Sequence, residues 1–343
     1  ICGAGFQHDG ASPKGGKKIG YGVCFVLIGL AVRLPGVSDR VFCLPYATRL
    51  WWPKSSKVKP RGRSYKTKPE LALELIVLTR SWVKPEITLR VVVDGGYSNS
   101  TVVKNRPAGV HITGKVRKDA VLYAPPEPHR VPAGRGRPRK KGTKLPKPSV
   151  RFNHCDTAWD ALFIELYGKE TVVLAEEFNA IWDRVGGNEI LSIVLVRDPD
   201  GEYPDMVVFE TDTHSTDLEI IKRFSHRWSI EITNRETKHL LGSADPQCRC
   251  ENSVSRAPLM AYWSYCLVVL WFVSQFRKGR DVLLPRTPWY PKKHITFSDM
   301  IAAARRSHMA PRILVDPALK QELPKFNVAR STRQRTSLRR AKL

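Results

Sequence analysis

An aspartate at the end of an apolar run is the first candidate for chemistry in this sequence. Asp94 follows the apolar residues 89–93 and precedes Gly95-Gly96. In open α/β sheets, ligands bind at the carboxyl ends of strands, where a carboxylate in this position would project. An aspartate before two glycines can also simply cap a turn, and this position alone does not separate the two interpretations.

The second candidate is a glutamate in residues 224–238, a polar segment with cations on both sides of it. At 3.6 residues per turn, four positions would share one helix face within about 60°: Phe224, Arg227, Glu231 and Lys238. A carboxylate flanked by cations suits a divalent metal that bridges to a phosphodiester, with arginine and lysine on the phosphates. The spacing equally fits a solvated face on which Arg227 pairs with Glu231.

The charge balance points to a polyanionic partner. The 343 residues include 57 Lys and Arg against 32 Asp and Glu, a formal net charge of +25. The hydrophobic fraction of 42% excludes a wholly disordered chain. Three segments are basic and free of acids, namely 54–68, 133–149 and 325–343. One such run is usually a solvated linker, but three in a chain of this charge favour a nucleic-acid partner.

Two arginines in the second basic segment have alternative interpretations. Arg135 and Arg137 alternate with glycine and precede Pro138. An extended segment of this kind can lie in a narrow A·T-rich minor groove, or it can touch phosphates only. The sequence leaves both open.

Around these residues the pattern is that of a mixed α/β fold. Strands are expected at 19–34, 41–46, 87–93, 171–174, 190–196 and 206–209. Residues 69–82 carry an apolar helical stripe, Leu71, Leu75, Leu78 and Trp82, and residues 215–276 are helical in pattern.

Cysteines and apolar runs give no sign of secretion or of a membrane. Seven cysteines in a chain of this length do not form a secreted disulfide framework, so we expect a reducing cytosolic compartment. Cys248 and Cys250 lack a second cysteine pair, which argues against zinc. Residues 258–276 are long enough to span a bilayer, but their polar members favour a helix buried on one side of a sheet.

Several segments resemble one family. Arg227, Glu231 and Lys238, with Phe224 in place of a tyrosine, match the spacing of the Y-R-E-K signature of bacterial insertion-sequence transposases with a DDE, RNase H-like domain. Further segments resemble the 701-type branch of this group: Gly3-Ala4-Gly5, 93–98, 114–120 and 134–142.

The resemblance implies an RNase H-like mixed sheet flanked by helices, with a β-rich insertion between the second and third catalytic acids. The expected division is 1–104 for the N-terminal part of the core, 105–205 for the insertion with its basic loop 133–149, 206–280 for the C-terminal part with the catalytic helix, and 281–343 for a basic extension.

The resemblance also implies roles for the residues that match. Asp94 and Glu231 would be the second and third acids and would bind Mg²⁺ or Mn²⁺ in a two-metal site. Several residues would contact DNA: Arg227, Lys238, Arg235, Phe224, Trp228, Arg135 and Arg137. Phe224 lacks the hydroxyl of the tyrosine, which removes one phosphate hydrogen bond, and Trp228 would stack on a base or simply pack.

The first acid of the family would lie on a strand upstream of Gly3, so we expect an N-terminally truncated chain with little strand-transfer activity. The function implied is a metal-dependent transposase that cleaves and joins double-stranded DNA at transposon ends and target, in the bacterial cytoplasm and nucleoid. The sequence leaves open whether the protein forms a homodimer on DNA. The alternative is a non-catalytic DNA-binding protein derived from a truncated transposase; an RNA-binding module has less support, because no aromatic-rich RNA-binding motif is present.

Overall fold

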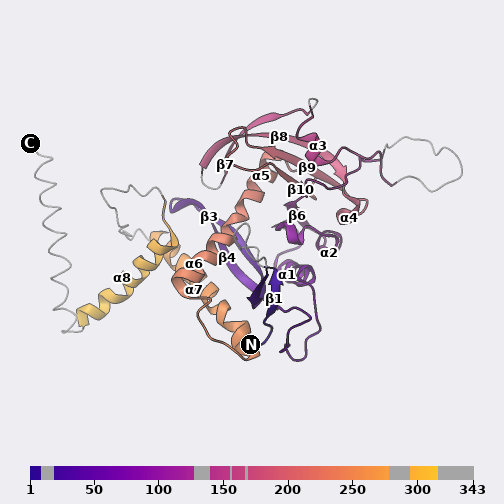
Figure 1. Ribbon diagram of the computed structural model, residues 1–343. Coiled ribbons are helices and arrows are strands. Elements are labelled where there is room, and N and C mark those ends of the chain that lie inside the picture. The colour runs from indigo at the N-terminus through magenta and orange to yellow at the C-terminus, as the bar shows by residue number, and fades with distance from the viewer. Residues whose placement is uncertain (9–18, 127–139, 155–156, 167–168, 278–293, 316–343) are drawn as a thin grey trace, which may run out of the picture. The chain divides into compact units, whose positions relative to one another are not determined.

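The computed structural model describes residues 1–8, 19–126, 140–154, 157–166, 169–277 and 294–315 (Figure 1). The chain divides into two compact units. The first consists of residues 1–33 and 40–263, and the second of residues 34–39 and 264–343. Both candidate acids belong to the first unit.

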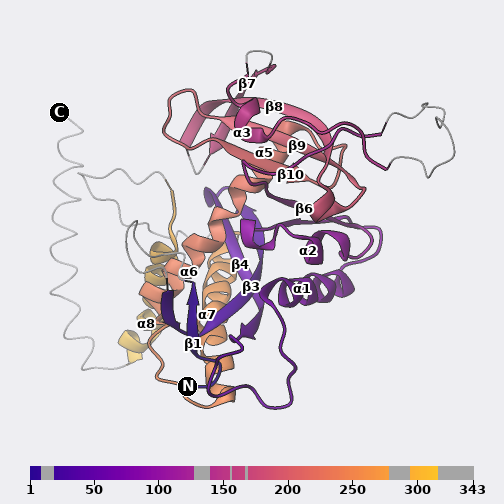
Figure 2. The same cartoon turned by 45° about the vertical axis from the view of Figure 1, so that its right-hand side comes forward.

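Within its described residues the first unit contains a six-stranded mixed sheet (Figures 1 and 2). In spatial order its strands are β5 (Leu89–Val92), β6 (Val110–Lys115), β10 (Met206–Glu210), β9 (Ile190–Arg197), β8 (Lys169–Ile181) and β7 (Asp160–Leu166). β5 and β6 are parallel, and every other neighbouring pair is antiparallel. The strands expected near residues 87–93, 171–174, 190–196 and 206–209 are thus confirmed. The strands β7, β8 and β9, which lie between the two acids in the sequence, extend this sheet.

Helices cover both faces of the sheet. On β9 the side chains alternate, because successive residues of a strand point to opposite faces. Ile193 and Leu195 belong to an apolar cluster with residues of the helices α1 (Lys68–Trp82), α2 (Ser100–Lys104) and α4 (Asp183–Gly186) and with Phe152, which follows α3 (Pro148–Arg151). Val194 and Val196 belong to the opposite cluster, with α5 (Asp217–His226). This arrangement confirms the expected mixed α/β fold and is consistent with an RNase H-like one.

Two smaller sheets lie before α1 in the sequence. β1 (Gly5–His8) pairs with β2 (Ile19–Gly22), and β3 (Cys24–Leu34) pairs with β4 (Ser38–Trp51). The prediction of a single strand at 19–34 is therefore wrong in one respect. The strand is interrupted at Val23, and the two parts, β2 and β3, pair with different strands. The strand expected at 41–46 is confirmed and is longer, because β4 continues in both directions.

Helix α1 confirms the helix expected at 69–82, but its buried face differs from the expected stripe. Thr67 and Glu70 form a capping box at its start, which explains where it begins. The buried positions are Leu71, Leu75, Ile76 and Thr79, whereas Trp82 is 61% exposed. Thr79 can be buried because its hydroxyl is hydrogen-bonded, donating to the Leu75 carbonyl at 2.7 Å.

The remaining helices follow β10, as the pattern of residues 215–276 predicts. They are α5, α6 (Trp228–Leu241) and α7 (Glu251–Arg277), and α8 (Phe297–Val315) comes later. Helix α7 buries one apolar face, with Val254, Ala261, Tyr265, Val269 and Phe272, and exposes another, with Met260, Trp263, Leu267 and Leu270.

By length and composition alone, residues 251–276 of α7 could cross a membrane, and 22% of their most apolar window is buried. Core helices of other proteins pass the same criterion. The expectation that this protein has no membrane segment stays a prediction.

The second unit joins the end of α7 to α8. The rings of Tyr265 and Phe297 lie with centroids 4.1 Å apart. The Ser38 hydroxyl donates to the carbonyl oxygen of Ile295 at 3.3 Å. The boundary between the units falls inside α7, after Trp263. The four-part division expected from the sequence stays a prediction.

A glycine on β6 permits close packing beside Asp94. A Cβ atom at Gly114 would lie 2.6 Å from the Ser98 hydroxyl oxygen, 2.7 Å from the Phe209 ring and 2.9 Å from a methyl group of Val93. Replacing Gly114 by Ala should therefore lower the free energy of unfolding by about 1–3 kcal/mol through overpacking. Urea denaturation followed by circular dichroism measures it.

The matched control is Gly96→Ala, because a Cβ atom at Gly96 would meet nothing within 4 Å. It should change the unfolding free energy little. Equal stability of both variants and the unmodified chain would contradict the packing described for Gly114.

Candidate functional site

Asp94 lies at the carboxyl end of β5, as its sequence context predicts. The backbone N–H of Val93 still donates to the carbonyl of Thr113 on β6, at 2.9 Å. The chain then turns through the short 3₁₀ helix Gly95–Tyr97, with the Tyr97 N–H donating to the Asp94 carbonyl at 2.8 Å. The Asp94 side chain is 65% exposed. A substrate can therefore reach this carboxylate.

Glu231 lies in the first turn of α6, just after the junction with α5. A capping box of Thr216 and Glu219 begins α5, and apolar residues such as Ile220 and Ile221 hold it against the sheet. The junction residue is Arg227, whose backbone N–H donates to the Phe224 carbonyl at 3.1 Å. The position of Glu231 on α6 thus depends on α5, the preceding helix, which packs on the sheet.

The structure brings Asp94 and Glu231 to one arginine. Nη1 of Arg227 donates to Oε1 of Glu231 at 2.6 Å and lies 3.7 Å from Oδ1 of Asp94. The arginine side chain is only 20% exposed. Two carboxylates that are distant in the sequence are therefore neighbours, and a cation lies between them.

The helix-face argument fails for Phe224. The chain forms two helices joined at Arg227 instead of one unbroken helix. Phe224 is 6% exposed and belongs to the apolar cluster under α5. The guanidinium of Arg227 lies over its ring, 5.7 Å from the centroid. Any contribution of Phe224 to DNA binding would have to pass through Arg227.

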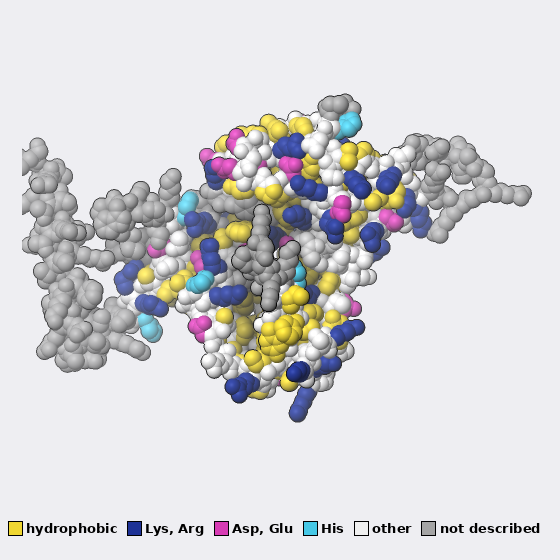
Figure 3. Space-filling view, viewed as in Figure 1, with side chains coloured by type: hydrophobic (Ala, Val, Ile, Leu, Met, Phe, Trp, Pro, Cys, Tyr) yellow, Lys and Arg dark blue, Asp and Glu magenta, His cyan; other side chains and the backbone are white. Residues whose placement is uncertain are grey.

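The other expected DNA contacts are at the surface or outside the described residues. Trp228 is 44% exposed. Arg235 and Lys238 are exposed and form no ion pair with a described residue. Figure 3 shows Lys and Arg side chains at many places on the face in view, and fewer acidic ones. Arg135 and Arg137 lie outside the described residues.

A buried ion pair close to the acids was not predicted from the sequence. The Glu210 carboxylate on β10 is fully buried and accepts hydrogen bonds from Arg223 on α5 and from the Thr113 hydroxyl on β6. It also accepts from the backbone N–H of Thr211 at 2.9 Å. The only sequence signal was a glutamate ending an apolar run. The pair fixes α5 on the sheet one turn before Arg227.

Two titratable side chains near the acids have shifted pKa values. Burial, with smaller contributions from Cys24 and Asp94, raises the pKa of Tyr97 to about 12. Burial together with the charges of Arg33, Arg223 and Lys222 lowers the pKa of His226. At neutral pH both side chains are therefore uncharged, and the Tyr97 hydroxyl is unsuited to act as a base.

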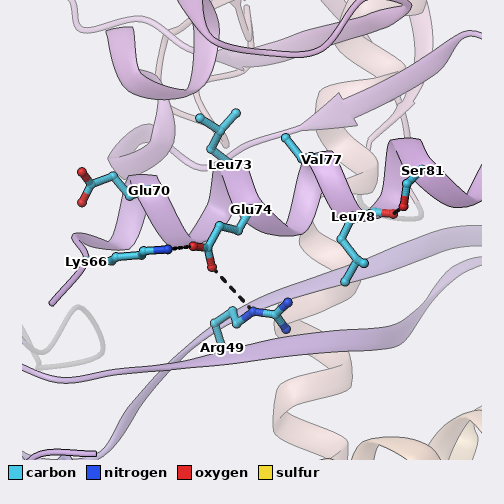
Figure 4. A pocket seen from close by; sticks show the side chains of 8 residues that line it. All are labelled: Arg49, Lys66, Glu70, Leu73, Glu74, Val77, Leu78 and Ser81. Atoms are coloured by element: carbon cyan, nitrogen blue, oxygen red, sulfur yellow. Dashed lines mark hydrogen bonds and ion pairs between the residues drawn. The ribbon is translucent and has the colours of Figure 1, made fainter. Parts of the chain in front are cut away.

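The described part of the chain contains no three-ligand metal site, and the groove that it shows lies elsewhere than at the acids. No group of three or more His, Cys, Asp or Glu side chains there could hold a metal ion. An open groove follows the outer face of α1, lined by Arg49, Lys66, Glu70, Leu73, Glu74, Val77, Leu78 and Ser81 (Figure 4). Neither acid is among these residues, and their side chains are 65% exposed for Asp94 and 39% exposed for Glu231.

Comparison with known proteins supports the expected class. Residues 5–167 match the family model described as DDE superfamily endonuclease. The match includes Asp94 and ends before Glu231. No curated protein matches this chain. The family match supports a DDE-type, transposase-like domain of the nuclease class in this part of the chain.

The ion pair of Glu210 and Arg223 yields a stability prediction. Replacing Arg223 by Met should lower the free energy of unfolding by about 3–5 kcal/mol, because a fully buried carboxylate loses its opposite charge. Adding Glu210→Gln to this variant should recover part of the loss. Urea denaturation at neutral pH measures both.

Arg117→Met is the control, since Arg117 pairs with Asp119 in an exposed position. It should leave unfolding almost unchanged. An Arg223→Met variant as stable as the unmodified chain would contradict a structural role for the pair.

Proposed function

We propose that this chain is the catalytic region of a DDE transposase of the insertion-sequence, 701-type group, which cleaves DNA at element ends and joins it to target DNA with a divalent metal. The observation that carries the proposal is the shared contact of Asp94 and Glu231 with Arg227. The family match over residues 5–167 supports the same class independently.

The two carboxylates suit a divalent metal. Carboxylate oxygens are the ligands that Mg²⁺ and Mn²⁺ prefer. In this structure the position between Asp94 and Glu231 holds a positive charge, the Arg227 guanidinium. Asp94 and Glu231 would be the metal ligands. A divalent metal held by these two carboxylates would supply an activated water molecule and charge neutralisation at a phosphodiester.

Arg227 then has a second task in the proposal. Its Nε atom is buried and has no hydrogen-bond partner among the described residues. A buried donor without an acceptor is costly, and a phosphate oxygen would satisfy it. Arg227 would therefore turn from the carboxylates to the phosphate once metal and DNA are bound. Phe224, beneath its guanidinium, would support this orientation.

The exposed side chains of α6 extend the proposed DNA contact. Arg235 and Lys238 would hold backbone phosphates. Trp228, which is 44% exposed, would stack on a base or pack against the protein. The transposon ends and the target are both double-stranded DNA in this proposal, a homodimer on DNA is compatible with it, and the place of action is the bacterial nucleoid.

A two-metal site takes one more carboxylate than the two brought together here. Within the described residues, β5 is an outer strand of its sheet and hydrogen-bonds only to β6. A further strand alongside β5 would reach the position next to Asp94. We propose that the first acid belongs to such a strand, and that the printed chain by itself has little strand-transfer activity.

A non-catalytic DNA-binding protein is the second candidate function. It is favoured by the same shortage of carboxylates among the described residues and by the net charge of +25. Such a protein would occupy DNA ends without cutting them. Metal binding at the two acids separates the candidates, because occupation of DNA needs no metal.

Metal binding is the first test. Mn²⁺ should bind to the full chain at a site that Asp94→Asn or Glu231→Gln weakens about tenfold or more, since each change removes a charged ligand. Electron paramagnetic resonance of free Mn²⁺ measures the affinity. Asp119→Asn is the control, because this exposed carboxylate pairs only with Arg117 among the described residues.

Unchanged Mn²⁺ affinity in both acid variants would overturn the metal site and leave the DNA-binding alternative. Nicking of supercoiled plasmid DNA with Mg²⁺ or Mn²⁺ is the parallel measurement. Efficient metal-dependent cleavage by the printed chain would contradict the expectation of little activity and would make the third carboxylate unnecessary.

The arginines of the basic loop have a separate test. If Arg135 and Arg137 read a narrow minor groove, replacing both by Lys should abolish a preference for A·T-rich duplexes, since arginine is the better minor-groove ligand. If they touch phosphates only, affinity at matched salt should hardly change. Fluorescence anisotropy with A·T-rich and G·C-rich duplexes measures the ratio.

A further inference from the structure

Arg33 and His226 are joined across the first unit by one hydrogen bond. Nη2 of Arg33, on β3, lies 3.4 Å from Nε2 of His226, at the end of α5. A guanidinium has donors only, so the imidazole nitrogen is the acceptor. His226 is therefore neutral here, with its proton on Nδ1, and that N–H can donate to another group.

The charges that act on the His226 imidazole are positive, namely Arg33, Arg223 and Lys222. Arg33 is exposed, and neither it nor Lys222, one turn before His226, forms an ion pair with a described residue. The nearby Arg223 is already paired with Glu210. The pKa of His226 is lowered first by burial and then by the positive charges of Arg33, Arg223 and Lys222, which agrees with a positively charged environment. An anion bound here would offset this repulsion.

The position of His226 in the chain connects the positive group formed by Arg33, Lys222 and His226 to the two acids. His226 immediately precedes Arg227, which contacts both Asp94 and Glu231. A phosphate held at this cluster would thus belong to the same DNA backbone as a phosphate at the acids. None of the three residues matches a position of the Y-R-E-K spacing.

We propose that Arg33, Lys222 and His226 form a phosphate-binding subsite for the DNA backbone beside the scissile position. The two cations neutralise the phosphate, and Nδ1–H of His226 donates to one of its oxygens. Because Arg33 comes from β3 and the other two from α5, bound DNA would hold these elements together. This inference rests on the proposed function and names further residues that position its substrate.

Salt dependence of DNA binding provides the test. The full chain is titrated into a labelled duplex of about 20 base pairs without divalent metal, at several salt concentrations. Each phosphate contact contributes about 0.9 to the slope of log affinity against log salt. Because the subsite holds one phosphate, Arg33→Gln and Lys222→Gln should each reduce the slope, and the double variant should reduce it by about one in total.

The control is Lys169→Gln, an exposed lysine paired with Glu202 at 2.6 Å, which should keep the full slope. Unfolding curves of all variants check that they fold. Unchanged slopes in both variants, with normal binding by the unmodified chain, would overturn the subsite and leave the proposed function intact. Failure of the unmodified chain to bind DNA would overturn both.

A local readout is the imidazole pKa of His226, followed by nuclear magnetic resonance. DNA should raise this pKa, because an adjacent phosphate stabilises the imidazolium, and His226→Gln assigns the signal. The charged groups that act on the imidazole are Arg33, Arg223 and Lys222. An equal rise with inorganic phosphate alone, without a slope change in the variants, would mark a small-anion site and overturn the DNA assignment.

Discussion

The shared contact of two carboxylates with one guanidinium is the constraint that the remaining structure satisfies. Asp94 and Glu231 would repel each other at this separation, and Arg227 offsets that repulsion. For the three to meet, the end of β5 must face the junction of α5 and α6. The position of that junction is therefore as important as the identity of the acids.

The sheet fixes the junction by both apolar and ionic contacts. Ile220, Ile221 and Phe224 attach α5 through the apolar cluster, and the buried pair of Arg223 and Glu210 locks its last turn. Apolar packing alone tolerates small shifts, whereas a buried ion pair with several hydrogen bonds has one geometry. This division of roles explains a buried charge so close to a site that needs accurate placement.

Sequence patterns predicted the local features and missed those made by distant residues. The apolar run and the two glycines placed Asp94 correctly at a strand end, and the apolar period placed α1. The period also suggested one continuous helix face from Phe224 onward, but α5 and α6 meet at Arg227 and Phe224 is in the core. The contact of Arg33 with His226 spans 193 positions, so no local pattern could predict it. The role proposed for Glu231 rests on the family resemblance.

The order of strands has a consequence for how the protein forms. β6 pairs with β10, and Thr113 bonds Glu210 from 97 positions away. During synthesis, the second edge of β6 must therefore stay unpaired until the ribosome has produced β10. Pairings between distant segments slow folding. The helices α5 and α6, with Glu231, emerge directly afterwards, so the contact of Glu231 with Asp94 through Arg227 would be among the last features of the first unit to assemble.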